Sequence, residues 1–536
     1  MKLGRAALFA AMVVFGMSAA ASGVGDAAPV PQAAPAAATP YGKLRGVART
    51  VPGTGLGVEQ FLGVPYAAAP VGSKRWREAG EPEAWDGVRD ATWDSAPCLQ
   101  ATGGTEDCLR ANVYRPAGTK SGSNLPVGVW VHGGANLSGS ASAQDPSRLV
   151  AEAGIIVVTI QYRLGAAGFL YLPAMGDYSG NFAVSDIVEA LRWVRKSIGA
   201  FGGDPSRVTL LSESTGSSDV CRVLVDKNAK GLFSGAVLQS DDCLHEFETP
   251  EKALKRSRFF LKKAGCAGEG GALACLKKVP ASRLAEASAA SGRWKPVAEA
   301  PAADLIAKGE WAKVPVLLGS DRNEARAAAT AFFSWSEDAY RVWLERLIGR
   351  DNAFRARKLY PADRYEEEDA YAVPYVMGDV MTDSGLRGLG GCATPRLGRT
   401  LRAGGAPGAW LYSFGDEAAP SRLDPRFPGY RALASHGTEL SYLFPDSGAF
   451  LALSARMTPE QKALARAMRA YWGNFVRRGN PNGEGLPEWK PYGEEGAVMS
   501  FAGKGPEAKT AAWYSDLHQC SFWDSIPPVM GRGSAR

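Results

Sequence analysis

Short apolar runs alternate with amphipathic runs through the middle of the chain. Residues 186–201 and 217–229 carry apolar side chains at helical spacing. Runs rich in Val, Ile and Leu, suited to burial on both faces, predict strands at 125–134, 154–163, 207–214, 231–240 and 311–320. Strands that alternate with helices predict an α/β fold, with a central, mostly parallel sheet and helices on both of its faces.

The ends of these strands carry the polar residues of most interest. In an open sheet of parallel strands, ligands bind outside the carboxyl ends of the strands. The segment WVHGGANLSG (130–139) includes the end of the first predicted strand, LSESTGSS (211–218) the end of the third, and LLGSDRNEA (317–325) the end of the fifth. We therefore expect the functional residues just after the strands.

Ser214 lies on the turn between a predicted strand and a predicted helix. That is where the motif G-x-S-x-G places the nucleophile of serine hydrolases, and a helix that begins there favours negative charge. Gly216 keeps the second glycine of the motif, whereas Ser212 replaces the first with another small residue. A serine that only caps the helix fits the same pattern.

The sequence HGGA predicts exposed backbone N–H groups after the first strand. Glycine lets the backbone approach a reacting oxygen closely, and two or three N–H donors form an oxyanion hole. Gly133, Gly134 and Ala135 are the candidates, with Thr215 after the serine; the expected donors are the N–H groups of the last three. The alternative is a glycine-rich turn. A phosphate-binding loop would need a Lys-Ser/Thr end that this segment lacks.

A nucleophilic serine needs a base, and the base needs an orienting acid. Glu324 follows the fifth strand, and His436 lies further along the chain. The order serine, acid, histidine is the order of α/β-hydrolases. The rival candidates are Asp321 for the acid and His245 and His518 for the base.

Composition narrows the class of protein. The chain has 536 residues and a net charge of only +6, which argues against nucleic acid as the main ligand. From about Tyr41 onward we find no linker-like break, so one large domain is expected. The basic run at 252–263 predicts a surface helix with a solvated basic face, in preference to a contact with a membrane or polyanion.

The first residues resemble an export signal. A basic start, an apolar run and then small residues predict a signal peptide at 1–22, with a retained membrane anchor as the alternative. An Ala/Pro-rich linker should follow at 23–41, then the main domain at 42–526 and a disordered tail at 527–536. No second long apolar run appears, so we expect no stable membrane anchor and a secreted or periplasmic protein.

Eight cysteines in an exported chain suggest disulfides, although they allow 105 pairings. Proximity and elimination suggest four candidate pairs: Cys98–Cys108, Cys221–Cys243, Cys266–Cys275 and Cys392–Cys520. The four histidines are scattered and there is no CxxC, so no metal site is expected.

Several long motifs, in order, resemble the type-B carboxylesterase/lipase family. They are FLGVPYAAAPVG (61–72), TEDCLRANVY (105–114), QYRLGAAGFL (161–170), FGGDPSRVTL (201–210) and LLSESTGSS (210–218), within a resemblance that runs from about Lys43 to Trp523. The resemblance implies an α/β-hydrolase fold, a small-molecule ester as substrate and no cofactor. Alternatives within it are a lipase, a specialised esterase for a lactone, feruloyl, toxin or drug ester, or a non-catalytic binding protein.

The resemblance also implies roles for residues at matching positions. Ser214 would be the nucleophile, Glu324 the acid and His436 the base, with Gly133, Gly134 and Ala135 at the oxyanion hole. Arg75 with Glu106, and Arg163 with Asp204, occupy positions of buried ion pairs. The family supports the pairs Cys98–Cys108, Cys266–Cys275 and Cys392–Cys520.

The departures from the family cluster near the expected site. They are Asn136, Ser212, Thr215, Asp241 and Asp242, and each adds polarity; neutral drift is the alternative reading. Asn136, which replaces an aromatic residue, and Glu213 are expected to contact the substrate. We therefore predict a preference for short or polar esters. Asn136-Leu-Ser138 is also the only N-glycosylation sequon, and a glycan there would obstruct the site.

Overall fold

The computed structural model describes residues 34–245, 247–267, 271–385, 388–421, 427–493 and 497–526, without the side chains of 366–370. The predicted signal peptide and C-terminal tail lie outside these residues. The chain divides into Met1–Ala34 and Pro35–Arg536, and the description below concerns the second unit.

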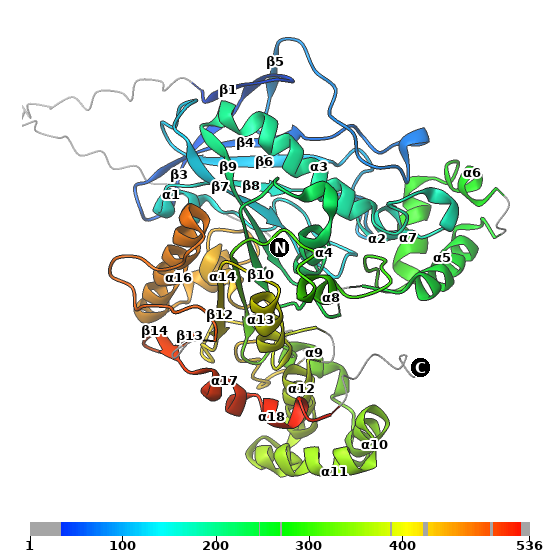
Figure 1. The fold of residues 1–536 in the computed structure, drawn as a ribbon, viewed down its shortest axis with the longest axis vertical. Helices are drawn as coiled ribbons and strands as arrows, with labels where there is room; N and C mark the ends of the chain where they lie inside the picture. The colour runs from blue at the N-terminus through cyan, green and yellow to red at the C-terminus, as the bar shows by residue number, and fades with distance from the viewer. Residues whose placement is uncertain are drawn as a thin grey trace, which may run out of the picture. The chain divides into compact units, whose positions relative to one another are not determined.

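An eleven-stranded sheet runs through this unit (Figure 1). In spatial order its strands are β14 (Gly505–Lys509), β13 (Val498–Ala502), β12 (Ala409–Phe414), β11 (Val316–Asp321), β10 (Gly235–Gln239), β9 (Gly203–Glu213), β7 (Leu125–Val131), β8 (Ile156–Ile160), β6 (Arg110–Pro116), β4 (Gly57–Pro65) and β3 (Val47–Thr50). Pairing is parallel from β13 to β8 and antiparallel at both margins. The predicted central, mostly parallel sheet is confirmed.

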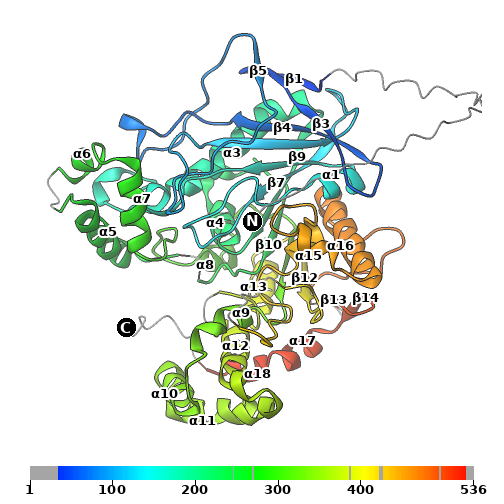
Figure 2. The same ribbon diagram turned by 180° about the vertical axis from the view of Figure 1, so that it is seen from behind.

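Helices cover both faces of the sheet (Figures 1 and 2). Alternate residues of β7 point to opposite faces, with Val129 in one apolar core and Trp130 in the other. The Val129 core includes residues of α2 (Gly165–Phe169), α3 (Phe182–Ser197), α4 (Thr215–Val225), α5 (Pro250–Ala264), α6 (Ala272–Leu276), α7 (Ala281–Ala290), α8 (Ala302–Ala307) and α13 (Ala393–Ala403). The Trp130 core includes residues of α1 (Ser147–Ala153), α14 (Leu440–Leu443), α15 (Leu451–Ala455) and α16 (Pro459–Arg478).

A third apolar core lies in the helices inserted after β11. It joins the C-terminal segment, whose Cys520 is linked to Cys392, to the inserted helices. The helices that contribute to this core are α9 (Arg326–Ala329), α10 (Glu337–Ile348), α11 (Arg350–Leu359), α12 (Ala372–Ser384) and α18 (Cys520–Trp523), whereas α17 (Ala511–Leu517) places Tyr514 in a small fourth core. Figure 1 shows α18 beside α12, and α10 and α11 at the margin of the molecule.

The predicted linker at 23–41 is wrong at its C-terminal end. There, β1 (Ala36–Thr39) turns back and pairs with β2 (Gly42–Arg45), and β5 (Val88–Asp90) completes a small separate sheet. Ala37 in β1 is 5% exposed, because this Ala/Pro-rich stretch packs on the domain instead of extending into solvent.

The basic run at 252–263 forms part of α5, as predicted. Phe260 and Leu261 are buried, whereas Lys252, Lys255 and Lys262 are exposed. Across the described residues, no helix is both long and apolar enough to cross a membrane.

Two ion pairs were inferred from the resemblance, and one is corrected. Arg75 pairs with Glu106 at 2.6 Å, as expected. Arg163 pairs instead with Asp186 on α3, again at 2.6 Å, because this helix packs beside the segment that follows β8. Asp204, at the start of β9, pairs with its near neighbour Arg207 in a more exposed position.

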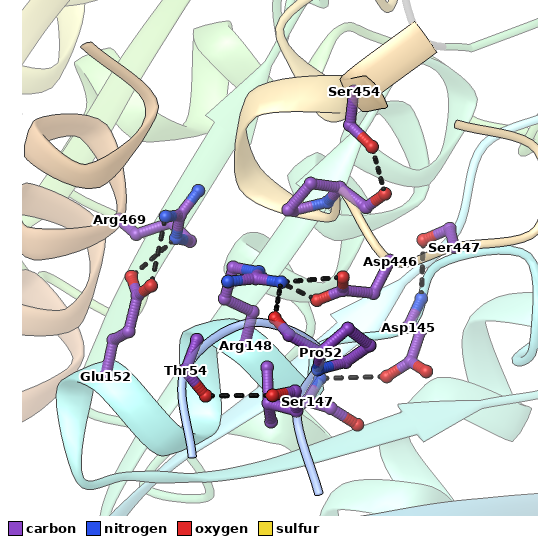
Figure 3. Close-up of polar contacts among 12 residues, drawn as sticks. Pro52, Thr54, Asp145, Ser147, Arg148, Glu152, Asp446, Ser447, Ser454 and Arg469 are labelled. Carbon is purple, nitrogen blue, oxygen red and sulfur yellow. Dashed lines mark hydrogen bonds and ion pairs between the residues drawn. The ribbon is translucent and has the colours of Figure 1, made fainter. Parts of the chain in front are cut away.

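Two ion pairs and a hydrogen bond connect α1 and the residue Asp145 just before it to segments that follow β12 (Figure 3). Arg148 donates to both carboxylate oxygens of Asp446, at 2.8 and 2.9 Å. Arg469 of α16 donates to Glu152 at 2.7 Å, and the backbone N–H of Asp145 donates to Ser447 at 2.7 Å. Bidentate Arg–carboxylate pairs fix orientation as well as distance. These contacts hold α1, which follows the glycine segment at 133–136, against the segment that follows His436.

All four predicted disulfides are present, and no described cysteine is free. Cys392–Cys520 spans a sequence separation of 128, and Cys266–Cys275 only 9. The entropy lost by the unfolded chain gives about 5 kcal/mol of stabilisation for a loop of the first size and about 3 kcal/mol for the second. Cys392→Ala/Cys520→Ala should therefore lower the urea midpoint more than Cys266→Ala/Cys275→Ala. An equal or larger loss in the short-loop variant would contradict this prediction.

Candidate active site

Ser214 occupies a strained turn between β9 and α4. Its backbone angles are φ 54° and ψ −132°, a conformation that costs a residue with a side chain of order 1–3 kcal/mol. The turn is tight, since a Cβ at Gly216 would lie 2.3 Å from the carbonyl oxygen of Val131. Ser214 is partly exposed, so its hydroxyl is presented at the carboxyl end of the sheet.

Ser212 fits the place of the missing glycine because its hydroxyl is fully satisfied. This buried side chain donates to the carbonyl of Val237 at 2.8 Å and lies 3.0 Å from the hydroxyl of Ser217. Ser217 in turn donates to the carbonyl of Gln239 and accepts from its N–H. The two hydroxyls thus join β9, the first turn of α4 and β10. Sequence reasoning missed Ser217 and Gln239, whose partners are set by tertiary packing.

The glycine segment after β7 lies directly against Ser214. A Cβ on Gly133 would approach the Cβ of Ser214 to 2.9 Å, so only glycine fits. Gly134 has φ 118°, and Ala135 has φ 60°. Within the described chain, the N–H groups of Gly134, Ala135 and Thr215 have no hydrogen-bond acceptor in the protein. Unengaged N–H groups beside a serine are what an oxyanion hole requires.

His436 connects Ser214 to Glu324. Its Nε2 lies 2.9 Å from the Ser214 Oγ, and its Nδ1 lies 2.7 Å from Oε2 of Glu324. Glu324 is completely buried, whereas the His436 side chain is 29% exposed and therefore accessible from solvent. The backbone N–H of His436 also donates to the carbonyl of Glu324 at 3.1 Å. A neutral imidazole held this way can take a proton from the serine while the carboxylate fixes its tautomer.

The rival histidines are engaged elsewhere. His245 lies 2.9 Å from Asp242, and His518 lies 2.6 Å from Asp383. The structure thus brings only one of the three candidate bases to Ser214.

Asp321, the rival acid, contacts Glu324 and not His436. Its N–H donates to Oε1 of Glu324 at 2.9 Å, and its Oδ2 accepts from the N–H of Thr438 at 3.0 Å. Burial, with the neighbouring carboxylates of Glu439 and Glu324, raises the pKa of Asp321 well above its usual range. Burial raises the pKa of Glu439 as well, and Oδ1 of Asp321 and Oε2 of Glu439 are both buried without a hydrogen-bond partner among the described residues.

A further carboxylate, Glu213, contacts the other side of the imidazole. Its Oε1 lies 3.2 Å from Nε2 of His436. Burial raises the pKa of Glu213 to about 8, although His436 opposes that shift. Burial alone would lower the pKa of His436, but the carboxylates of Glu213 and Glu324 raise it to about 10. The two groups in contact therefore titrate as a pair that shares protons.

This pairing predicts how Glu213→Gln changes the pH profile. Below its pKa, protonated His436 cannot act as a base, so activity falls on the acid side. The Glu213 carboxylate raises the pKa of His436, and glutamine removes that effect without removing volume. We expect the acid limb of kcat/KM to move to lower pH in Glu213→Gln. A limb that stays in place or moves to higher pH would contradict the electrostatic coupling.

The expected contact between Asn136 and substrate is corrected by the structure. Asn136 is 1% exposed, and its Nδ2 lies 3.3 Å from Oδ1 of Asp219 and 3.4 Å from the carbonyl of Trp294. Its side chain therefore points into the protein, because Asp219 on α4 offers it a polar partner. A buried amide is also unavailable for glycosylation in the folded protein, and the predicted selection of polar esters by Asn136 loses its basis.

Thr215 and Asp241, which also differ from the family pattern, form hydrogen bonds within the protein as well. Thr215 Oγ1 accepts from the N–H of Asn136 at 3.2 Å, and Ser218 donates to Asp241 at 2.6 Å. Within the part of the chain that the structure describes, no group of three or more His, Cys, Asp or Glu side chains is arranged to hold a metal ion.

Comparison with known proteins agrees with this architecture. The family model described as "Carboxylesterase family" matches residues 33–523. Human cocaine esterase is 30% identical, over 92% of this chain and 92% of that protein. Para-nitrobenzyl esterase of Bacillus subtilis is 32% identical, over 85% of this chain and 92% of that protein. A solved carboxylesterase of Geobacillus stearothermophilus matches with a TM-score of 0.73 at 29% identity, covering 91% of this chain and 99% of that one.

The matches extend across both faces of the sheet and all the segments that meet at Ser214. The chain therefore belongs to the carboxylesterase family, and it is a carboxylic ester hydrolase with the α/β-hydrolase fold.

Proposed function

We propose that the chain hydrolyses small-molecule esters through an acyl-enzyme on Ser214, with His436 as base and Glu324 as its orienting acid. The observation that carries the proposal is the continuous line of hydrogen bonds from Glu324 through His436 to Ser214. Its relatives cocaine esterase and para-nitrobenzyl esterase support a small ester as the substrate.

In the first half-reaction, Ser214 attacks the ester carbonyl while His436 takes its proton. The carbonyl oxygen becomes negative in the tetrahedral intermediate, where the N–H groups of Gly134, Ala135 and Thr215 would stabilise it. The intermediate collapses, His436 gives its proton to the leaving alcohol, and the acyl group remains on Ser214.

In the second half-reaction, water replaces the alcohol. His436 removes a proton from the water, the hydroxide attacks the acyl carbon, and the proton returns to Ser214 as the carboxylic acid leaves. Glu324 accepts the hydrogen bond from Nδ1–H of His436, which stabilises the imidazolium in both steps. Burial raises the pKa of both Asp321 and Glu439, and a proton held there would limit the negative charge around His436.

We also propose that the protein acts outside the cytoplasm, in the periplasm or as a secreted protein. Four disulfides support this localisation, because disulfides persist in oxidising compartments. The N-terminal sequence pattern is the second support.

Partitioning between water and hydroxylamine tests the acyl-enzyme. Acetate esters of several alcohols would all produce the same acetyl-Ser214 and differ only in the alcohol that has already left. We expect one ratio of hydroxamate to acetate for all of them, at rates that differ with the alcohol. A ratio that depends on the alcohol would show direct attack on the ester and overturn the proposed intermediate.

A further inference from the structure

The glycine segment beside Ser214 ends at Asn136, which is held at three points. Its N–H donates to Thr215 Oγ1 at 3.2 Å, and its carbonyl accepts from the N–H of Gly165 at 2.7 Å. The third point is the side-chain amide, which faces Asp219. The backbone of Asn136 has φ 56°, a left-handed conformation that asparagine tolerates better than most residues. The position of Asn136 therefore sets where the preceding N–H groups lie.

The contact with Asp219 leaves two oxygens without a donor. Asn136 Nδ2 has two hydrogens, and it has two acceptors: Oδ1 of Asp219 and the carbonyl of Trp294. Because the Trp294 carbonyl can only accept, the amide must present its nitrogen on this side. Oδ1 of Asn136 and Oδ2 of Asp219 are then both buried with no hydrogen-bond partner among the described residues.

One proton on Asp219 would give both of these oxygens a hydrogen-bond partner. Asp219 is fully buried, and no cationic side chain in the described structure pairs with it. An ionised carboxylate in such a place is very costly, whereas a neutral carboxylic acid is not. Burial accordingly raises the pKa of Asp219 well above its usual range. A proton on Oδ2 converts that oxygen into a donor, and Oδ1 of Asn136 is an acceptor that lacks one.

We propose that Asp219 is a positioning residue that carries a proton and forms a cyclic acid–amide pair with Asn136, which fixes the oxyanion segment. In this pair, Asn136 Nδ2–H donates to Asp219 Oδ1, and Asp219 Oδ2–H donates to Asn136 Oδ1. The inference rests on the proposed function, since it concerns the segment whose N–H groups would hold the oxyanion.

The pair should matter more for the transition state than for the bound ester. Oxyanion donors act on charge that develops only during the reaction, so a small shift of the segment weakens the transition state selectively. A trifluoromethyl ketone, which forms a charged tetrahedral adduct with an active-site serine, reports on these donors. The Ki of this inhibitor and the KM of a p-nitrophenyl ester are therefore the paired measurements.

Two truncations and one conservative variant test the proposal. Asp219→Ala removes the acid, and Asn136→Gly removes the amide with a residue that accepts φ 56°. Each should raise the trifluoromethyl ketone Ki about 10-fold or more while KM changes less than about 3-fold. The double variant should be no worse than the poorer single variant, because each truncation already breaks the pair. Asp219→Asn should restore a Ki close to that of the wild type, since an amide can donate and accept in the same positions.

Three results would overturn the proposal: parallel changes in Ki and KM, effects that add in the double variant, or an Asp219→Asn variant as poor as Asp219→Ala. Asp226→Asn, at the other end of α4, is the matched control and should change neither quantity. Failure of the proposed function is separable, because it would appear as a wild-type protein that forms no adduct at Ser214.

Discussion

Ser214→Ala is expected to lower kcat/KM for p-nitrophenyl acetate by roughly 10⁴-fold or more, with an unchanged melting temperature. The hydroxyl accepts or donates one hydrogen bond, to His436 at 2.9 Å, and the backbone turn remains available to alanine at the cost already present in the native state. Because the serine and histidine act as a unit, removing the nucleophile removes the acyl-enzyme route and leaves only what the remaining N–H groups contribute.

Ser217→Ala is the matched control for that experiment. Ser217 lies on the same first turn of α4, and its hydroxyl is bonded to the carbonyl of Gln239 instead of to His436. A loss below about 10-fold is expected there, since the hydrogen bonds between Ser217 and the backbone of Gln239 connect α4 to β10 and involve no reacting atom. Turnover retained in Ser214→Ala, or an equal loss in both variants, would contradict the assignment of Ser214.

Glu324→Gln is expected to lower kcat by roughly 10² to 10⁴-fold, while Asp321→Asn lowers it less than about 10-fold. Glutamine at 324 keeps the shape but loses the charge that stabilises the imidazolium, and its amide can donate to Nδ1 and so favour the unproductive tautomer. Asp321 contacts Glu324 through its backbone N–H, which asparagine preserves. Steady-state kinetics of the two variants at one pH make the comparison. A larger loss in Asp321→Asn would move the acid to Asp321.

The parts of the site that follow from local sequence could be predicted. Apolar runs predicted the central strands, and the strand–turn–helix context placed Ser214 at the junction of β9 and α4. Chain order fitted Glu324 and His436 without excluding Asp321 or His518, and the family resemblance then assigned the two roles to Glu324 and His436. These inferences depend on periodicity and on short motifs, both of which the sequence carries directly.

The contacts that the sequence did not predict connect residues far apart in the chain. The direction of the Asn136 side chain depends on Asp219, more than eighty residues later, which no local pattern links to it. The resemblance paired Arg163 with Asp204, whereas the packing of α3 places Asp186 against it. The strand at Ala36–Thr39 forms because β2 supplies a partner, although its own composition resembles a linker. In each case tertiary packing decided between alternatives that composition left open.

The central claim is that Ser214 is the nucleophile, and covalent trapping tests it most directly. The full chain is incubated with a fluorophosphonate, which reacts with activated serines, and then analysed by intact mass and by peptide mapping. The account predicts one adduct per chain, on the peptide that contains Ser214, formed in step with the loss of ester hydrolysis and absent from Ser214→Ala. An adduct on any other residue that accompanies the loss of activity would contradict it.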